Sequence, residues 1–369
     1  MVSSGSRIYI HTPRWFLRPR NTDWVYTRFR LRRISEFVPE CRFVVSQSIA
    51  TMAWFNFNYA HRVARRKIGR PIESAAPVIV DLREFRRSGC DAVFCHDDFP
   101  RNTEGIPVIW QNSVLDPEMT LAYGGSEAAL ARSKDEKGEG FRRAAVVQVS
   151  SEAERARLGG WFPEVADRFV AIPFFLPDVA AIPLEKLEEK LARGGQLRCL
   201  FVGHEARRKG LARVYDALMH MPGEARAQLQ MTVVSTQADG AIPAPSLPNL
   251  HVVPGLPHDR VLELMRDSDV FVMPSHFESY GLAYLEAMAQ GTIPIVSNWE
   301  VQREIVDYGK AGVVTSGEPA DLARWLVRLR EDAQYRTELA RAARHRFETH
   351  YAPQVVARKF ASMAARFSQ

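Results

Sequence analysis

VFVMPSHFESYGLAYLEAMAQGTIPIVS, residues 270–297, is the stretch that decides how the C-terminal half of the chain folds. It opens with an apolar run, Val270–Pro274, passes through a polar loop, Ser275–Tyr280, and closes with a second apolar run, Thr292–Ser297. The segment between them, Gly281–Gln290, is predicted to be a helix. An apolar strand, a helix and a second apolar strand in this order predict a parallel sheet covered on both faces.

The alternation of strand and helix continues on both sides of this stretch. Short apolar runs predict strands, and apolar residues with a 3.6-residue period predict helices. The further predicted elements are the strands Leu197–Val202, Leu229–Ser235 and His251–Val253, the helix Leu211–Met221, a helix capped by Asp259, and a helix that opens at Pro319. Together these elements predict a Rossmann-like C-terminal half.

The N-terminal half shows a less regular version of the same pattern. Its candidate strands are Arg7–Ile10, Phe43–Ser46, Val78–Val80, Ala92–Cys95, Val108–Trp110, Val146–Ser150 and Phe169–Ile172. Prolines interrupt the periodicity within Pro173–Gly195, which places a domain boundary there. A length of 369 residues also favours two domains over one.

We therefore expect an α/β fold with two Rossmann-like domains that face each other across a cleft. The first spans residues 1–174 and the second residues 175–352, and a final helix over 353–369 packs back on the first domain. Ligands of open parallel sheets bind beyond the carboxyl ends of the strands, so the cleft is the expected site.

Charge is distributed unevenly along the chain. The formal net charge is +6, and residues 1–70 contain 14 Lys or Arg against 3 Asp or Glu. A basic N-terminal part suggests an anionic partner, namely phospholipid, a phosphorylated acceptor or nucleic acid. A solvated arginine-rich surface without a partner is the simpler alternative.

The sequence also bears on location and on cysteine chemistry. No apolar run approaches the roughly 18 residues of a membrane-spanning helix, and no signal-peptide core follows the first residues, so we expect a cytoplasmic protein. The cysteines are Cys41, Cys90, Cys95 and Cys199. None of them has CxxC spacing, which argues against a zinc or redox centre and favours four free buried thiols.

Two glutamates, Glu278 and Glu286, lie close to the predicted start of the helix in the opening stretch. The backbone N–H groups of Tyr280, Gly281 and Leu282 stand at that helix N-terminus, where they suit an anion such as a diphosphate. Gly281 also permits close approach of the backbone. A carboxylate beside a diphosphate is favourable where it accepts hydrogen bonds from hydroxyls, and sugar hydroxyls are the obvious donors.

A second segment, Phe201–Gly210 (FVGHEARRKG), adds positive charge to the same expected cleft. The strand ends at Gly203, and the following loop carries Arg207, Arg208 and Lys209 toward the next helix. Three cations at the carboxyl end of a strand suit a diphosphate. Each of these features taken singly is equally compatible with a solvated turn or helix.

Taken together, the two segments resemble the family 4 retaining glycosyltransferases of GT-B fold. The resemblance rests on the EX7E pattern from Glu278 to Glu286, on the EAMAQG run that follows, on the RKG loop, and on NLHVVPGL at Asn249–Leu256. It covers about residues 144–350. Two glutamates at this spacing are common on helices, but the ordered set in a strand–loop–helix context is specific.

The resemblance implies a role for each matching residue. Glu278 contacts hydroxyls of the donor sugar, and Glu286 holds the ribose hydroxyls. Lys209, helped by Arg207, neutralises the leaving diphosphate, and residues 253–256 lie near the nucleotide base. The implied donor-binding set is Gly203, Arg208, Val253, Gly255, Leu256, Tyr280, Gly281, Leu282 and Glu286.

The resemblance also implies a mechanism without a protein nucleophile. The reaction proceeds on one face of the sugar, and the leaving phosphate takes the proton of the acceptor. The protein then contributes mainly electrostatic stabilisation of the departing diphosphate. No metal or other cofactor is expected, and the sequence offers no DxD-like pair in a suitable place.

The chain departs from the family mainly on the acceptor side. His204 stands where the family often has an arginine after the strand glycine, and Arg207 or Arg208 is the expected substitute. A GGSE element at Gly124–Glu127 is either a phosphate-approaching loop or an ordinary helix start. His96, in FCHDDFP, ends a strand and is either an acceptor-side catalytic residue or a structural histidine.

The segment Trp54–Arg70 mixes aromatic residues with Arg and Lys, which fits contact with an anionic membrane surface. The alternative is that the aromatic residues are buried in the core and the cations solvated. Nucleic-acid binding would use similar residues, but no nucleic-acid motif accompanies them and it is not expected.

The sequence thus predicts a hexosyltransferase that transfers the sugar of a UDP- or GDP-linked donor to a glycan or lipid-linked acceptor. The expected pathway is cell-envelope polysaccharide or glycolipid biosynthesis. Another sugar-nucleotide enzyme of GT-B fold, or a phosphorylase, is the alternative, and a non-enzymatic lipid-binding module is a third hypothesis. A cytoplasmic location, with or without peripheral contact at the inner face of the membrane, accompanies the prediction. Sugar, acceptor and oligomeric state are left open.

Overall fold

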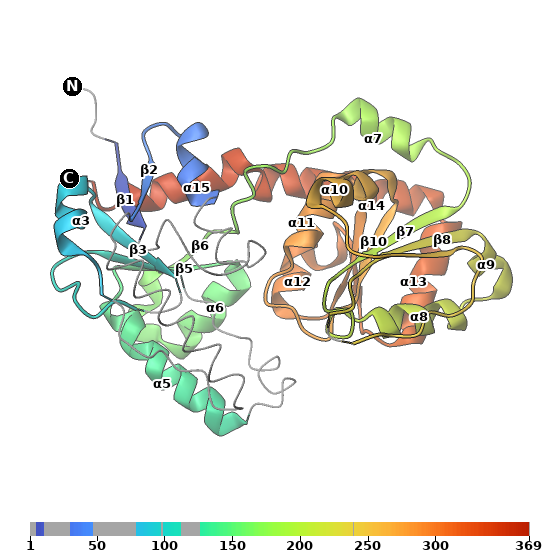
Figure 1. Ribbon diagram of the computed structural model, residues 1–369, viewed down its shortest axis with the longest axis horizontal. Helices are drawn as coiled ribbons and strands as arrows, with labels where there is room; N and C mark the ends of the chain where they lie inside the picture. Colours follow the sequence, from blue (N-terminus) through green and yellow to red (C-terminus); the bar gives the residue numbers. More distant parts are fainter. Residues whose placement is uncertain are drawn as a thin grey trace. The chain divides into compact units, whose positions relative to one another are not determined.

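A computed structural model describes residues 5–10, 30–46, 79–96, 99–111, 126–238 and 240–368. The described residues form two compact units. The first draws on the described residues up to 111, on 126–178 and on 353–368, and the second on the described residues of 179–352. Figure 1 shows the strands and helices of each unit.

The first unit is built on a parallel sheet. Among the described residues this sheet has the strand order β2-β1-β3-β4-β5-β6. The strands are β1 (Arg7–Ile10), β2 (Arg42–Val45), β3 (Ala92–His96), β4 (Val108–Gln111), β5 (Val146–Val149) and β6 (Phe169–Ala171). The helices are η1 (Arg32–Glu36), α3 (Leu82–Ser88), α5 (Glu127–Arg143), α6 (Glu152–Trp161), η2 (Pro163–Arg168) and α15 (Pro353–Ala364).

The second unit repeats the design with a parallel sheet in the order β12-β11-β10-β7-β8-β9. Its strands are β7 (Leu197–Val202), β8 (Leu229–Val234), β9 (Leu250–Val253), β10 (Val270–Met273), β11 (Ile293–Ser297) and β12 (Val313–Thr315). Its helices are α7 (Leu184–Leu191), α8 (Leu211–His220), α9 (Gly223–Ala227), α10 (His258–Asp267), α11 (Leu282–Ala289), α12 (Glu300–Ile305), η3 (Asp307–Gly309), α13 (Pro319–Glu331), α14 (Ala333–Arg346) and η4 (Phe347–Tyr351).

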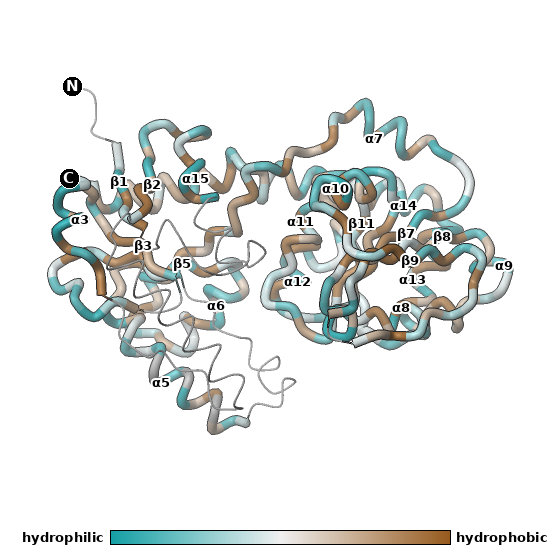
Figure 2. The backbone as a smooth tube through the Cα atoms, in the orientation of Figure 1, coloured by the Kyte–Doolittle hydropathy of each residue, from teal (hydrophilic) through white to brown (hydrophobic). Residues whose placement is uncertain are grey.

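Burial follows the expected pattern for sheets covered on both faces. The strands β10 and β11 are buried along their whole length, as β4 and β5 are in the first unit. In Figure 2 the hydrophobic colour follows the central strands, whereas outer helices such as α7 are largely hydrophilic. The predicted α/β fold with two Rossmann-like parallel sheets is therefore confirmed.

Three local predictions are wrong. Residues 79–80 of the predicted strand Val78–Val80 are not in a strand, because the side chain of Asn102 takes both backbone groups of Val80 at 2.8 Å. Asp259 does not cap α10, which begins one residue earlier with Pro257 at the N-cap position. Cys90 is only partly buried, although the other cysteines are buried free thiols as expected.

The helix α15, at the C-terminal end of the chain, completes the hydrophobic core of the first unit. Its apolar residues Val356, Ala357, Phe360 and Met363 join a buried cluster that includes residues of β1, β2 and β3. The Phe360 ring lies 5.9 Å from the ring of Phe43 on β2, with the ring planes perpendicular. A helix that ends the sequence thus packs against strands that begin it.

We expect Phe360→Ala to lower the free energy of unfolding by about 3–5 kcal/mol, because it leaves a cavity in a fully buried site. Urea unfolding followed by circular dichroism measures this change. Arg358→Ala, at an exposed position of the same helix, is the control and should stay within about 0.5 kcal/mol of the parent. Equal stabilities of the two variants would contradict a core role for α15.

Candidate active site

Two loops of the second unit bring the predicted donor-site residues together. One loop, residues 203–210, follows β7, and the other, residues 274–281, follows β10. These strands are neighbours and run parallel, so both loops emerge at the carboxyl edge of the sheet. This is the edge at which open parallel sheets bind ligands.

Backbone contacts hold the two loops against each other. Gly210 has φ +83°, and a Cβ atom there would lie 2.1 Å from the carbonyl oxygen of Pro274. The backbone N–H of His276 donates to the carbonyl of Arg208 at 2.8 Å. Arg213 Nη1 donates to the same Pro274 carbonyl at 3.2 Å. Only glycine at position 210 allows this approach, which sets the distance between the loops.

Charged side chains from both loops meet at Glu278. Lys209 Nζ forms an ion pair with Glu278 Oε2, and Arg208 Nη1 lies 3.5 Å from the same oxygen. Glu278 is only 8% exposed, so its charge depends on these cations for compensation. Gly203 leaves room for the lysine stem, since a Cβ atom there would lie 2.9 Å from Lys209 Cγ.

The N-terminus of α11 begins beside this ion pair. Gly281 is the N-cap residue with φ +94°, and no side chain caps the helix. A Cβ atom on Gly281 would lie 2.4 Å from the ring of Tyr284, so the turn requires glycine. The Tyr284 hydroxyl donates to the Met273 carbonyl at 2.7 Å, and burial raises its pKa. Leu282 is the first residue of the helix, so Tyr280–Leu282 stand at its positive end.

Gln302 on α12 fixes the loop that carries Glu278. Its Nε2 atom donates to the Glu278 carbonyl at 2.9 Å and to the Tyr280 carbonyl at 2.8 Å. Gln302 has no exposed surface, so these bonds are not exchanged with water. The residue was missed by the sequence analysis, because a glutamine in WEVQRE carries no chemical signal of its own.

Glu286 lies on α11, one turn into the helix and 7% exposed. Its Oε1 atom is 2.9 Å from Nε2 of His258, the first residue of α10. His258 was also missed, because the predicted cap at Asp259 placed His258 in the loop before the helix. The contact orients the carboxylate of Glu286 through a neighbouring helix.

The remaining predicted donor-site residues lie along the same edge of the sheet. Val253 ends β9, and a Cβ atom on Gly255 would lie 2.8 Å from the methyl group of Thr236. Thr236 Oγ1 is 3.1 Å from Nδ1 of His204, in the loop after β7. Leu256 follows directly and is partly buried.

Arg207 lies apart from the cluster around Glu278. Its guanidinium donates to the Ala241 carbonyl at 3.0 Å, and the side chain is exposed. Arg208, whose guanidinium also stacks 5.3 Å from the centre of the Phe277 ring, takes the position beside Lys209. The structure therefore brings Arg208 and Lys209, and not Arg207, to the buried carboxylate.

On the acceptor side, little of the predicted set falls within the described residues. His96 ends β3 of the first unit and is partly buried. Its neighbours Asp97 and Asp98 lie outside the described residues, as do Trp54–Arg70 and the two glycines of Gly124–Glu127. Within the described ranges, no three His, Cys, Asp or Glu side chains come together as a metal site. Nor does any helix in those ranges combine the length and apolar character that a membrane span needs.

The two parallel sheets and the loops at the edge of the second define the class of protein as a GT-B fold. The chain superposes on Anabaena HepE in complex with UDP-glucose with a TM-score of 0.60 at 13% identity, over 98% of this chain and 99% of that one. WaaG, a glycosyltransferase involved in lipopolysaccharide biosynthesis, gives a TM-score of 0.59 at 16% identity, over 97% and 99%. These likenesses confirm the predicted fold.

The sequence itself carries a family signature: residues 184–346 match the family of glycosyl transferases group 1. A glycogen synthase of Mycobacterium tuberculosis is 34% identical over 176 residues, which are 45% of this chain and 41% of that protein. A D-inositol 3-phosphate glycosyltransferase of Thermomonospora curvata is 40% identical over 91 residues, 24% and 21% of the two chains. The chain thus spans less than half the length of these curated relatives.

We expect Gly210→Ala to lower the free energy of unfolding by about 2–3 kcal/mol, because the methyl group meets the Pro274 carbonyl and φ is positive. Gly223→Ala is the matched control, since a Cβ atom there has no neighbour within 4 Å. It should leave the protein equally stable or up to about 1 kcal/mol more stable. Urea unfolding compares the two, and a Gly210→Ala protein as stable as the control would contradict the close approach of the loops.

Proposed function

We propose that the chain is a retaining glycosyltransferase that moves a hexose from a UDP- or GDP-linked donor to a glycan or lipid-linked acceptor. The observation that carries the proposal is the ion pair of Lys209 with the buried Glu278, joined by Arg208, at the positive end of α11. Two cations and a helix N-terminus suit a diphosphate, and a carboxylate next to them suits sugar hydroxyls. The match of residues 184–346 to glycosyl transferases group 1 supports the same reaction class.

The proposed donor pose divides the site into three parts. The diphosphate lies at the amides of Tyr280–Leu282, with Lys209 and Arg208 against its oxygens. The sugar hydroxyls donate to Glu278, which gives up part of its contact with Lys209 when the diphosphate arrives. The ribose hydroxyls donate to Glu286, whose carboxylate His258 holds in place at 2.9 Å.

The proposed chemistry breaks the bond between the anomeric carbon and the diphosphate and forms a bond from the acceptor oxygen to the same face of that carbon. The proton of the acceptor hydroxyl goes to the leaving phosphate oxygen. Lys209 and Arg208, both partly buried, stabilise the charge that develops on the diphosphate. Neither a metal nor a protein nucleophile enters this scheme.

The acceptor side of the proposal rests on the sequence. A cell-envelope glycan or a lipid-linked acceptor, His96 as a catalytic residue, and membrane contact through the basic segment Trp54–Arg70 all remain predictions. A cytoplasmic location, at the inner face of a membrane, is likewise a prediction from the sequence.

We predict that Glu278→Gln and Lys209→Met each lower kcat/KM for sugar transfer by about 100-fold or more, because each removes a charge fixed against the reacting groups. Arg208→Met should lower it more than Arg207→Met, since only Arg208 reaches Glu278. A thermal-shift panel of UDP- and GDP-sugars first identifies the donor, and donor hydrolysis and transfer are then measured. The anomeric configuration of the product, read by NMR, tests retention.

Glu263→Gln and Lys186→Met are the matched controls, because both side chains sit in exposed ion pairs away from the two loops. They should transfer sugar at the parent rate. A Glu278→Gln protein of full activity would exclude the proposed site, and transfer to inorganic phosphate in place of a hydroxyl acceptor would favour the phosphorylase alternative. Stabilisation by none of the sugar nucleotides would favour a binding module.

A further inference from the structure

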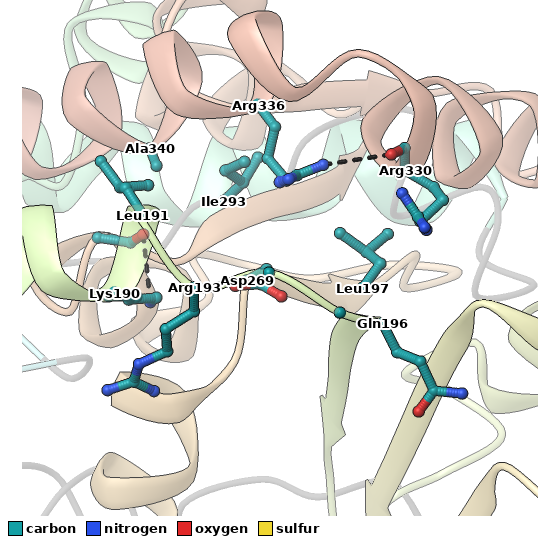
Figure 3. Close-up of a pocket in the computed structure, with 13 residues that line it drawn as sticks. Lys190, Leu191, Arg193, Gln196, Leu197, Asp269, Ile293, Arg330, Arg336 and Ala340 are labelled. Carbon is teal, nitrogen blue, oxygen red and sulfur yellow. Dashed lines mark hydrogen bonds between the residues drawn. The ribbon is translucent and has the colours of Figure 1, made fainter.

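A cavity lies at the edge of the same sheet opposite to the candidate active site. It has a volume of about 170 Å³ and sits where β7, β10 and β11 begin, at Leu197, Asp269 and Ile293. Figure 3 shows Arg330 and Arg336 entering it from α13 and α14, and Lys190 from α7. The candidate active site is at the carboxyl ends of these strands, so the two locations are separated by the length of the strands.

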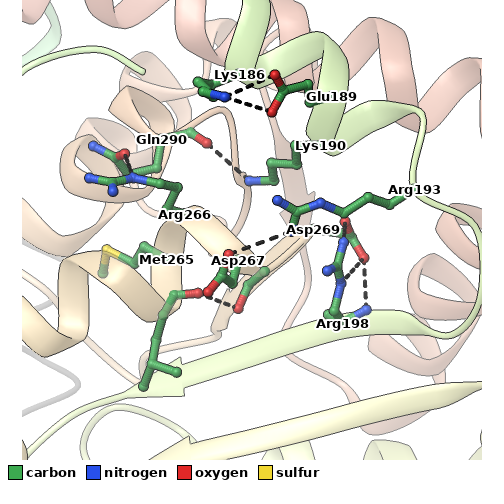
Figure 4. Close-up of polar contacts among 12 residues, drawn as sticks. Lys186, Glu189, Lys190, Arg193, Arg198, Met265, Arg266, Asp267, Asp269 and Gln290 are labelled. Atoms are coloured by element: carbon green, nitrogen blue, oxygen red, sulfur yellow. Dashed lines mark hydrogen bonds and ion pairs between the residues drawn. The ribbon is translucent and has the colours of Figure 1, made fainter. Parts of the chain in front are cut away.

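Positive charge dominates the lining of this cavity. Lys190, Arg193, Arg330 and Arg336 line it, against one carboxylate, Asp269. That carboxylate is already engaged by Arg198, through the backbone N–H at 2.9 Å and the guanidinium at 3.1 Å. Figure 4 shows this pair and the bond from Arg193 to Asp267 at the rim.

Of the four cations, only Arg193 forms an ion pair among the described residues, and two of the others are the arginines Arg330 and Arg336. Arg336 Nη1 donates to the carbonyls of Leu329 and Arg330 at the end of α13, at 2.6 and 3.4 Å. Arg330 Nη2 donates to Gln228, but its Nε atom is buried without an acceptor. A buried guanidinium N–H that lacks an acceptor is unfavourable, and it points to an acceptor that a ligand would supply.

The turn after α7 adds backbone donors to the cavity. Gly194, Gly195 and Gln196 line it, and their N–H groups have no hydrogen-bond acceptor within the part of the chain that the structure describes. Gly195 has φ +97°, and a Cβ atom on either glycine would meet nothing within 4 Å. Successive free N–H groups in such a turn form a concave site for an anion.

Lys190 closes the inner end of the cavity. It is 2% exposed, and its Nζ atom donates to the carbonyls of Gln290 and Gly291 and to Thr292 Oγ1, at 3.0, 3.3 and 2.8 Å. Burial lowers the pKa of Lys190 to about 7, and the charge of Asp269 acts in the opposite direction. An anion in the cavity would favour the charged form of this lysine.

We propose that this cavity binds a small phosphate dianion, either inorganic phosphate or the phosphomonoester group of a phosphorylated sugar. Planar guanidinium groups and free backbone amides match the several oxygens of a phosphate, and the two unpaired arginines balance its charge. The volume accommodates the phosphate and a small polar group attached to it. The site is distinct from the donor site and does not depend on the proposed transfer reaction.

The test is isothermal titration of the full chain with inorganic phosphate and, separately, with ribose 5-phosphate. Lys209→Met serves as the background, so that phosphate binding at the candidate active site is suppressed. We expect saturable binding of at least one probe. Tighter binding of ribose 5-phosphate identifies a phosphorylated sugar as the occupant, and equal binding identifies phosphate. No binding of either probe at millimolar concentration would overturn the proposal.

Position 194 offers a variant pair that leaves every contact of the cavity intact. The space around Gly194 is open, so Gly194→Asp adds a negative charge and Gly194→Asn adds a neutral side chain of the same shape. We expect Gly194→Asp to weaken binding at least tenfold and Gly194→Asn to weaken it less than threefold. Equal affinities of these two variants would exclude an anion site here.

A second comparison uses α13. Arg330→Gln removes a lining guanidinium and should weaken binding about tenfold. Arg324→Gln, on the same helix, removes an exposed arginine that pairs with Asp321 and does not line this cavity, so it should bind like the parent. If Arg330→Gln fails to fold, as judged by circular dichroism, the pair at position 194 decides the question.

Discussion

The donor edge of the second unit depends on the close approach of Gly210 to the carbonyl of Pro274. This contact sets the separation of the loops after β7 and β10, and the bond from His276 to the Arg208 carbonyl locks their register. Once the loops are fixed, the side chains of Lys209 and Glu278 are close enough to form their ion pair. A buried ion pair of this kind is favourable only with good geometry, so the backbone contact is the condition for the charges.

The charge cluster also explains why so many uncharged residues surround it. Gly203 leaves space for the stem of Lys209, Gly281 lets the chain turn into α11, and Gln302 occupies the carbonyls on both sides of the turn. None of these residues contributes charge. Each restricts the conformation of the loops, so that Glu278 stays beside the cations. The site is therefore organised before any ligand binds.

Much of this could be predicted from the sequence, because strand–loop–helix order is local. The apolar runs predicted the strands of the second sheet other than β12, and the loops after β7 and β10 follow from where those runs stop. The sequence could not predict which of Arg207 and Arg208 lies beside Glu278. Adjacent side chains point in different directions, and those directions depend on the conformation of the turn. Gln302 and His258 act across helices, and such contacts between elements distant in sequence leave no periodic or motif signal.

The wrong strand prediction in the first unit also results from a contact between residues distant in sequence. Residues 79–80 are apolar and resemble a strand, yet the side chain of Asn102 satisfies the backbone groups of Val80 that a neighbouring strand would otherwise bind. A tertiary hydrogen bond thus overrides a local preference. The helix α15 shows the opposite case, in which local pattern and tertiary contact agree: its apolar stripe lies in the core of the first unit.

Helix α11 links the two edges of the second sheet in one electrostatic element. From Tyr284 to Ala289 every residue is buried, so the C-terminal end of this short helix is poorly screened by water. Its N-terminus faces the Glu278 cluster, and its last carbonyls would present negative charge only about 12 Å away. Lys190 Nζ binds the carbonyls of Gln290 and Gly291, which follow the helix, and offsets that negative end. These acceptors and Thr292 Oγ1 give the buried amine of Lys190 three hydrogen-bond partners at this end of the helix.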